Sequence, residues 1–557
     1  MGKSDVKVRP DIFIFGLPMR IPFSFVLIAL CSLLSINARA QDTAKVNAYY
    51  DLVKTWGVLK YYSPAVNKGT VDWDSVLVVK FEVIANFGPD SFYHSLNSWV
   101  KQYAYNKKLK PAKDTIVSGF KNVDSLTVNS LINLTSLKVI KGYYFKGAKG
   151  CNYPYLPCFK NELNYDDKEL WRKEVRFLAL ARFWNIIEYF YPYKDQLREN
   201  WDSVLAKYIP IVLNVKNPQQ FEYVLLQLSV SLHDAQTHVN TSGTLGYVWN
   251  KKLPPIQIKQ VEGKAVITAV YDDSLSKTIK PGMVVTEIEG EPADSIILPL
   301  TSFISGDNDF QKANSLIFDF ILAGKPGSLM HLKVQGVDGK TTELKVERKL
   351  SLDELQKAVV LQLRASGKLN DSIGYINAAN TGEKEWERQM KQMKTTKGLV
   401  IDLRQYPQWS WQALHIYFVK HGCGATLNRT PDLHHPGRFL TVKDGSGSGK
   451  ERYKGKVAVL VSEGTISRGE YFAMLLKQCG KDITFVGTTT AGGVGTYTSA
   501  YLPGSIMVSY TGTGEFYDNH ETAQRKGLTP GVIVNPTIKG LQAGRDEVLE
   551  KAVEVLR

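Results

Sequence analysis

The amino-acid sequence predicts a multidomain α/β protein with three differently built parts. The chain has 557 residues, which is too long for a single hydrophobic core. Two similar segments with helical periodicity lie in the N-terminal half. Short β-like runs separated by turn signals follow, and in the last third apolar strands alternate with helices. We therefore expect a helical domain over residues 41–250, a β-rich domain over 252–350 and an α/β domain over 355–557.

The first 40 residues have the pattern of a secretory signal peptide. Basic residues such as Lys3 and Arg9 precede the apolar run "IPFSFVLIALCSLLS". Small residues at Ala38 and Ala40 then form a cleavage site before Gln41. A membrane anchor is the alternative, but the apolar run is short for crossing a bilayer. The sequence therefore predicts an exported protein.

The overall composition is that of an ordinary globular protein, with 44% hydrophobic and 22% charged residues. The net charge is +15, yet the sequence has no Arg/Lys run with interleaved aromatic residues, so nucleic-acid binding is not expected. No CxxC or HExxH motif is present. We therefore expect neither a metal nor an organic cofactor.

Four cysteines remain beyond the predicted cleavage site. Cys151 and Cys158 bracket "NYPYLP", and in an oxidising compartment they can close a small loop. Cys423 and Cys479 are expected to be unpaired and buried.

An internal repeat marks the helical part. The segment Trp56–Leu77 aligns without gaps with Trp184–Leu205, and eight of the 22 positions are identical. We expect two related helical units over residues 45–105 and 165–235. The second unit carries an aromatic stripe that is typical of an amphipathic helix, and core packing is a commoner use of such a stripe than ligand binding. The stripe consists of Phe177, Leu180, Trp184, Ile187 and Tyr191.

The middle part contains runs such as "AVITAVY" and "MHLKVQG", broken by turn signals such as "KPGM" and "VDGK". The phrase "SKTIKPGMVVTEIEGEPADS" resembles the pattern of PDZ domains, so residues 252–350 are expected to be PDZ-like. PDZ domains take a peptide as an added strand, often by its C-terminal carboxylate. The alternative is a β-module that only spaces other domains.

The last third contains near-continuous apolar runs, "KGLVIDLR", "KVAVLVSE" and "DITFVG", which predict buried parallel strands. Chemistry in such sheets gathers at the carboxyl ends of the strands. Ser467 lies between the second of these strands and the helical run "GEYFAMLLKQ". Two interpretations are open. Ser467 can cap the helix in a capping box with Glu470, or it can be a nucleophile beside the free amides of Arg468 and Gly469.

Several motifs in this part resemble the C-terminal processing, or tail-specific, serine protease family, which is related to the tricorn protease core and to retinoid-binding protein repeats. The motifs are "KGLVIDLRQYP", "VLVSEGTISRGEYFAM", "VGTTTAGGVGT" and "QRKGLTPGVIVNPT". The resemblance implies a ClpP/crotonase-like catalytic domain over residues 355–557. It also implies an exported serine endopeptidase that cleaves polypeptides through an acyl-enzyme. Similar exported members occur in Bacteroidetes-type bacteria, so the periplasm or cell envelope of a Gram-negative bacterium is the expected location.

The resemblance assigns roles to residues around the strand–helix corner. Ser467 matches the attacking serine, Glu470 the glutamate of S-x-x-E, and the amide of Arg468 one donor to the oxyanion. A Gly-Gly pair normally supplies the second donor after the D-L-R strand. Here "DLRQYPQWS" lacks glycines, so the backbone of Tyr406–Gln408 is the expected region.

The base departs from the commonest pattern of the family. The turn that often carries a lysine reads "TAGGVG", with Gly492 and Gly493. The chain is therefore similar to the lysine-less, tricorn-like branch, which uses a histidine from a D-x-H-T segment. In "SLHDAQTHVN" an ungapped match places Gln236 at the histidine position, whereas a two-residue insertion matches His238, our expected base. His233 is the second candidate.

An acid that orients the histidine is expected in the loop "DNHETAQRKGLTP", with Glu521 as the first choice and Asp518 as the substitute. Three departures favour another function, namely a catalytically degenerate member that binds peptides. These are the missing lysine, the missing Gly-Gly pair and the displaced histidine.

Overall fold

The computed structural model describes residues 43–104, 117–147, 155–241, 251–408, 417–418, 423, 426–443, 453–480 and 482–557. Residues Ala40–Arg557 form one compact unit. The predicted signal peptide lies outside the described residues and stays a prediction. Within the described part of the chain, no helix is both long and apolar enough to cross a membrane.

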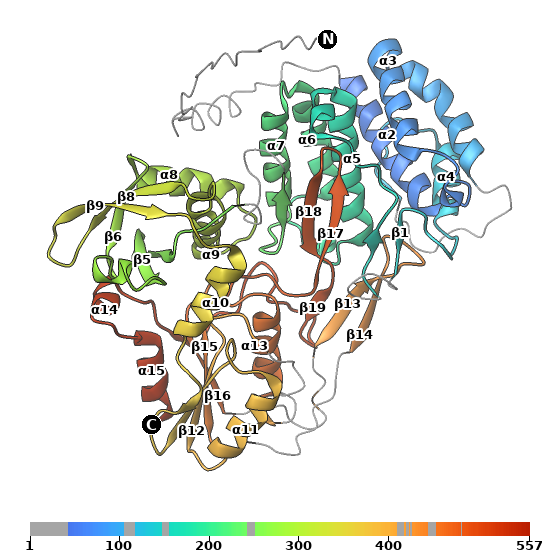
Figure 1. Ribbon diagram of the computed structural model, residues 1–557. Coiled ribbons are helices and arrows are strands. Elements are labelled where there is room, and N and C mark those ends of the chain that lie inside the picture. Colours follow the sequence, from blue (N-terminus) through green and yellow to red (C-terminus); the bar gives the residue numbers. More distant parts are fainter. Residues whose placement is uncertain are drawn as a thin grey trace, which may run out of the picture. The chain divides into compact units, whose positions relative to one another are not determined.

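Helices dominate the N-terminal part (Figure 1). Helix α3 contains Gly88 and Pro89, and its backbone kinks there because Gly88 has a φ of 84°. Asp72, Asn200 and Asn217 cap α3, α6 and α7 by accepting hydrogen bonds from first-turn amides. The helices are α2 (Thr43–Tyr62), α3 (Trp73–Tyr103), α4 (Ser125–Leu134), α5 (Lys173–Phe190), α6 (Trp201–Asn214) and α7 (Pro218–Val230).

The two similar segments share one local geometry. In the first, the indole nitrogens of Trp56 and Trp73 donate to each other's backbone carbonyls, at 2.8 and 3.1 Å. In the second, Trp184 and Trp201 do the same at 2.9 and 3.0 Å. The aromatic stripe on α5 is buried, at 0–1% exposure, so it packs in the core as expected. Its members are Phe177, Leu180, Trp184, Ile187 and Tyr191.

Two cysteines among the described residues, Cys158 and Cys423, are disulfide-bonded. The expectation that Cys423 is unpaired is therefore wrong, and Cys423 is half-buried rather than buried. Every other cysteine of the chain is more than 50 residues from Cys423 in the sequence, so local spacing could not predict its bond. Cys151 lies outside the described residues, so the loop that it would close stays a prediction.

The middle part is an antiparallel sheet of order β4-β5-β6-β8-β9, with β7 paired to β6. Strand β4 is at the edge, and α9 continues into a π-helical turn, Ile317–Leu322. The elements are β4 (Ile256–Val261), β5 (Lys264–Val270), β6 (Val284–Ile288), β7 (Glu291–Pro292), β8 (Leu329–Gln335), β9 (Thr341–Glu347), α8 (Ala293–Leu300), α9 (Asp309–Leu316) and α10 (Leu352–Gln362).

The C-terminal part contains a six-stranded sheet of order β10-β11-β12-β15-β16-β20, parallel from β11 onward. The expected alternation of apolar strands and helices is confirmed. The strands are β10 (Gly367–Lys368), β11 (Ile373–Asn377), β12 (Gly398–Asp402), β15 (Lys456–Val461), β16 (Ile483–Gly487) and β20 (Val532–Ile533). The helices are α11 (Glu383–Met393), α13 (Arg468–Cys479), α14 (Ile538–Gln542) and α15 (Glu547–Leu556).

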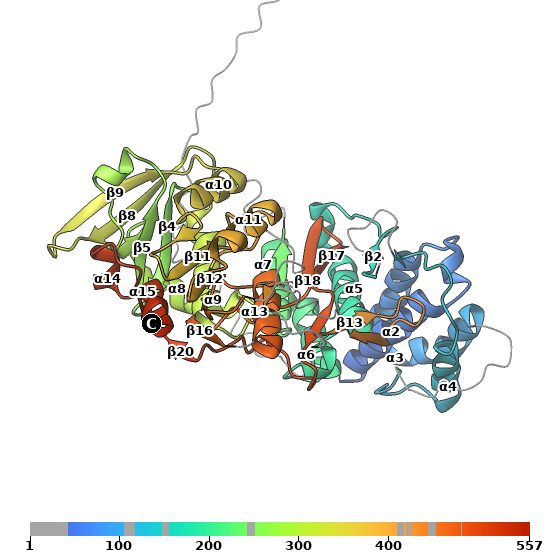
Figure 2. The same cartoon turned by 90° about the horizontal axis from the view of Figure 1, so that it is seen from below.

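Helices cover both faces of this sheet (Figure 2). On one face, Val459 of β15 packs with Trp386 of α11 and Phe472 of α13. On the other face, Leu460 packs with Val548 of α15. Because successive strand residues point to opposite faces, the strands are apolar along their whole length.

Two small sheets complete the chain. The first has the order β17-β18-β3, so a strand from the N-terminal half pairs with a C-terminal hairpin. The second has the order β14-β13-β19. The strands are β3 (His238–Asn240), β17 (Tyr497–Leu502), β18 (Ile506–Thr511), β13 (Leu427–Pro431), β14 (Phe439–Lys443) and β19 (Gly514–Phe516); a short hairpin pairs β1 (Phe145–Lys146) with β2 (Cys158–Phe159).

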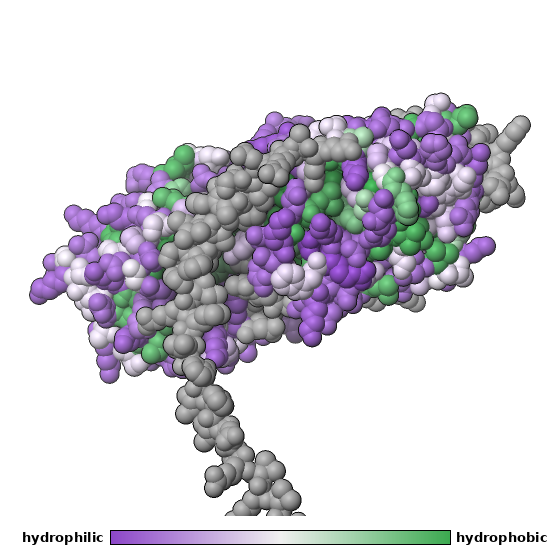
Figure 3. Space-filling view, turned by 90° about the horizontal axis from the view of Figure 1, so that it is seen from above, coloured by the Kyte–Doolittle hydropathy of each residue, from purple (hydrophilic) through white to green (hydrophobic). Residues whose placement is uncertain are grey.

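The surface seen in Figure 3 is mainly hydrophilic, with separate hydrophobic areas between. Such scattered apolar residues are normal for a soluble domain and need no partner.

Candidate active site

Ser467 lies at a strained corner between β15 and α13. Its backbone angles are φ 55° and ψ −115°, which a residue with a side chain rarely adopts and which cost on the order of 1–3 kcal/mol. The corner is held from outside the helix, because the amide of Ser467 donates to the carbonyl of Gly493 at 2.7 Å. The Ser467 hydroxyl donates to the carbonyl of Gly495 at 3.3 Å. Its side chain makes no capping bond to α13, so the capping-box interpretation is wrong.

Glu470 faces the protein interior instead of the helix end. It is fully buried, and its carboxylate accepts hydrogen bonds from the amides of Gly492 and Gly493, both at 2.7 Å, and from the Thr490 hydroxyl. Burial raises the pKa of Glu470 to about 7, although these three hydrogen bonds favour the charged form. Glu470 thereby fixes the turn whose carbonyl holds the amide of Ser467.

Two backbone amides among the described residues are candidates for binding a developing oxyanion. Arg468 is the first residue of α13, so its amide has no partner inside the helix. In the region expected to supply the second donor, Pro407 has no N–H and the amide of Gln408 donates to Ala378. Tyr406 remains. The Arg468 guanidinium lies over the Tyr406 ring at 5.3 Å and donates to the Pro407 carbonyl at 3.2 Å, which holds this loop beside the corner.

Gln236 occupies the space next to Ser467. Its side-chain Nε2 donates to the carbonyls of Gly493 and Gly495, at 2.8 and 3.1 Å. These are the same carbonyls that the amide and hydroxyl of Ser467 contact. The ungapped match of the D-x-H-T segment therefore gives the residue that stands beside the serine, and that residue is a neutral amide.

His238 lies two residues further on, in β3, opposite Ser509 of β18. It is half-buried and lines a small cavity together with Phe303 and Asp319. Burial lowers the pKa of His238, an effect that the nearby Asp234 opposes. Between these described residues, the structure contains no hydrogen bond from Ser467 to His238.

The other predicted side chains do not meet at the serine. His233 is 2.7 Å from the carboxylate of Asp307 through Nδ1. Glu521 and Asp518 are both exposed in the loop before β20. Sequence analysis missed Gln524 in the same loop, which is buried and accepts a 2.8 Å hydrogen bond from the amide of Val494. No local pattern distinguishes Gln524 from its neighbours.

Residues 372–534 match the family model described as Peptidase family S41. Among solved structures, mature CPAF complexed with lactacystin is 14% identical, with a TM-score of 0.52 over 68% of this chain and 98% of that chain. A serine-to-alanine mutant of CPAF is 14% identical, with a TM-score of 0.53 over 68% and 96%. The photosystem II D1 C-terminal processing protease is 15% identical, with a TM-score of 0.39 over 67% and 98%. A search of curated proteins finds no match.

Residues 372–534 form a peptidase family S41 domain. The resemblance to the C-terminal processing proteases is thereby confirmed, and the domain is that of a serine-type peptidase. In this S41 domain, the turn that lacks the lysine is closely packed. A Cβ atom on Gly493 would lie 3.1 Å from the Cγ of Gln236 and 3.1 Å from the Cβ of Ala235. Gln236 therefore fills the space into which a side chain at position 493 would project.

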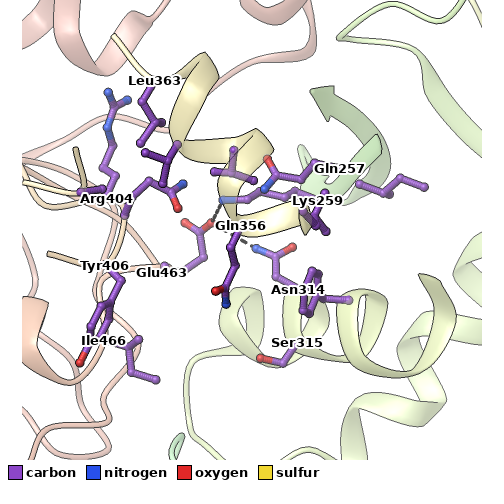
Figure 4. Close-up of a pocket in the computed structure, with 18 of the residues that line it drawn as sticks. Gln257, Lys259, Asn314, Ser315, Gln356, Leu363, Arg404, Tyr406, Glu463 and Ile466 are labelled. Atoms are coloured by element: carbon purple, nitrogen blue, oxygen red, sulfur yellow. Dashed lines mark hydrogen bonds and ion pairs between the residues drawn. The ribbon is translucent and has the colours of Figure 1, made fainter. Parts of the chain in front are cut away.

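A cavity of about 520 Å³, here called the β4 cavity, begins beside the corner and extends from the S41 domain to the antiparallel sheet (Figure 4). The edge strand β4, helices α9 and α10, and the loops after β12 and β15 line it, and Ile466 brings the lining to the residue before Ser467. Glu463 accepts from Lys259 and from Asn314, both at 3.2 Å. Among the described residues, no group of three or more His, Cys, Asp or Glu side chains is placed to hold a metal ion.

Proposed function

We propose that the chain is an exported serine endopeptidase of the tail-specific type, which cleaves polypeptides through an acyl-enzyme on Ser467. The observation that carries this proposal is the backbone of Ser467, at φ 55°. Strain of this kind persists where the surrounding structure enforces it, and it presents a nucleophile at a strand–helix corner. A serine that served only as a helix cap would need no such conformation.

The wall of the β4 cavity supports the same function. Strand β4 is an edge strand, and α9 lies beside it, with the side chain of Asn314 accepting from the amide of Gln260 at 2.9 Å. An edge strand next to a helix is the arrangement by which PDZ domains add a peptide as a further strand. We therefore propose that the sheet is PDZ-like and leads a polypeptide toward Ser467.

The proposed chemistry is acyl transfer. The Ser467 oxygen attacks a peptide carbonyl while the amides of Arg468 and Tyr406 bind the oxyanion, and water later releases the acyl group. His238 is the proposed base. Burial lowers the pKa of His238 and so favours the neutral imidazole that a base needs. Catalytic hydrogen bonds often tighten only when substrate binds, and this mechanism requires His238 to approach Ser467 in that state.

A second candidate function is peptide binding without cleavage. The observation that favours it is Gln236, whose amide stands beside Ser467 and cannot accept the serine proton as a base does. In that case the S41 domain would keep its fold without peptidase activity.

Labelling with a fluorophosphonate probe separates the two functions. The chain from Gln41 onward, Ser467→Ala and His238→Ala would be treated under identical conditions. Labelling of the parent chain and loss of labelling in both variants would support the peptidase with His238 as its base. A folded parent chain that stays unlabelled would reject hydrolysis and leave peptide binding.

A further inference from the structure

Asp319 is a buried carboxyl group in the wall of two cavities. It lies in the π-helical turn that extends α9, and only 8% of its surface is exposed. It lines both the β4 cavity and the smaller cavity that contains His238. Within the described residues, the Asp319 carboxylate makes neither a hydrogen bond nor an ion pair. Burial raises its pKa to about 7, and Lys251 is the one cation that lowers it.

An unpaired buried carboxylate is costly, so its presence in a cavity wall requires an explanation. A ligand that brings a positive charge would remove this cost, because an opposite charge within a few ångströms favours the ionised form. π-helical turns also occur frequently at functional sites. The position of Asp319 therefore suits the binding of a cationic group of a ligand.

The other charges in the wall of the β4 cavity are already compensated. Lys259 pairs with Glu463 at 3.2 Å. Arg404 pairs with Asp402 at 2.7 Å and, through both terminal nitrogens, with Asp546 at 2.8 Å. Among the described side chains that line this cavity, Asp319 is thus the charged one without a hydrogen bond or ion pair, and Lys251 acts on it only from beyond ion-pair distance. A ligand carboxylate would find no available cation there, whereas a ligand cation would find Asp319.

The apolar part of the wall suits a long basic side chain. Phe318 and Leu322 flank Asp319 in the π-helical turn, and Leu355 and Val359 of α10 also line the cavity. Lysine and arginine side chains bury their aliphatic stems against such surfaces while the charged end reaches a polar partner.

We propose that the β4 cavity selects polypeptides carrying a lysine or arginine side chain, whose charged end pairs with Asp319. This inference rests on the proposed function in that a polypeptide occupies the cavity, and it specifies the class of polypeptide. It does not depend on whether Ser467 cleaves the chain.

Binding measurements test the proposal without turnover. Fluorescein-labelled decapeptides with Lys, Met or Glu at one position in turn would be titrated into the Ser467→Ala chain, and anisotropy recorded. At one position, we expect the Lys peptide to bind at least about tenfold more tightly than the Met peptide. Asp319→Asn should abolish this preference. The matched control, Asp309→Asn, removes an exposed charge from the same helix and should keep the preference.

Equal affinity for the Lys and Met peptides at every position would overturn the proposal, as would a preference for Glu or for a free C-terminal carboxylate. The proposal would also be overturned if Asp319→Asn kept the preference for Lys, or if no peptide bound to the chain. If Asp319→Asn fails to fold, the comparison of Lys, Met and Glu peptides on the chain with Asp319 intact still tests the proposal. A preference for Lys in a chain that resists the fluorophosphonate probe would reject hydrolysis and keep the inference. Labelling of the parent chain by the probe, without a preference for the Lys peptide, would support hydrolysis and reject the inference.

Discussion

The side chain of Gln236 and the hydroxyl of Ser467 both donate to the carbonyl of Gly495, at 3.1 and 3.3 Å. Gln236 comes from the segment before β3, whereas Ser467 begins α13, so the fold brings together residues that lie far apart in the sequence. The shared acceptor places a neutral amide where a serine peptidase needs a proton acceptor. The reactivity of Ser467 therefore depends on which side chain occupies position 236.

Replacing Gln236 with histidine should raise the reactivity of Ser467. An imidazole at this position would stand beside the hydroxyl and could accept its proton, and general-base catalysis contributes about 10²–10⁴-fold. We expect the rate of fluorophosphonate labelling to increase at least about tenfold in Gln236→His. Gln236→Asn, which keeps a neutral amide, is the control and should not gain. An unchanged rate in folded Gln236→His would show that the site lacks more than a base.

Gly493 and Gln236 should be energetically coupled. A methyl group at position 493 would crowd the Cγ of Gln236 at 3.1 Å, and overpacking of this kind costs about 1–3 kcal/mol. Gly493→Ala should therefore destabilise the parent chain, and should cost less in a Gln236→Ala background. Urea unfolding of the two single variants and the double variant measures the coupling. Strictly additive effects would contradict the contact.

Glu470→Gln should destabilise the corner and lower the reactivity of Ser467. The amide group of Gln would place a donor against one of the two amides, Gly492 or Gly493, that now donate to the carboxylate. A buried unpaired donor costs about 1–3 kcal/mol. Thermal unfolding and probe labelling would show the loss, with Glu343→Gln on the exposed face of β9 as control. Equal melting temperatures for the two variants would argue against this role.

Asp319 should make folding stability depend on pH. Its pKa is about 7 in the native state against an ordinary value of 3.8, so the native state binds this proton more tightly than the unfolded chain. Stability from this group is present below about pH 4 and is lost as the pH rises to about 7. Asp319→Asn should therefore match the parent chain near pH 4 and exceed it at pH 8, by an amount on the order of a few kcal/mol. Urea unfolding across this range is the measurement, and parallel curves for the two chains would refute it.

The sequence was sufficient to predict the elements that depend on local patterns. Apolar strands such as Gly398–Asp402 and Lys456–Val461 are buried on both faces, so their character is visible in the sequence itself. The same holds for the aromatic stripe of α5. Ser467 was recognisable because its motif lies in one contiguous segment between β15 and α13.

Contacts between residues far apart in the sequence could not be predicted from such local patterns. The ungapped match placed Gln236 at the histidine position, but its contacts with Gly493 and Gly495 depend on more than 250 residues of intervening fold. The inward orientation of Glu470 was missed because S-x-x-E also fits a capping box. The disulfide at Cys423 and the unpaired Asp319 likewise depend on neighbours from distant segments.

The pairing of β3 with β18 limits how this protein can be divided. The segment that matches the S41 family, residues 372–534, includes β18 but not β3, whose His238 pairs with Ser509. Expressed alone, that segment would expose an unpaired strand edge, the feature that promotes aggregation. It would also lose Gln236 and leave the corner of Ser467 without its neighbour. A fragment that keeps the serine corner intact therefore has to begin before Gln236, so that β3 stays paired with β18.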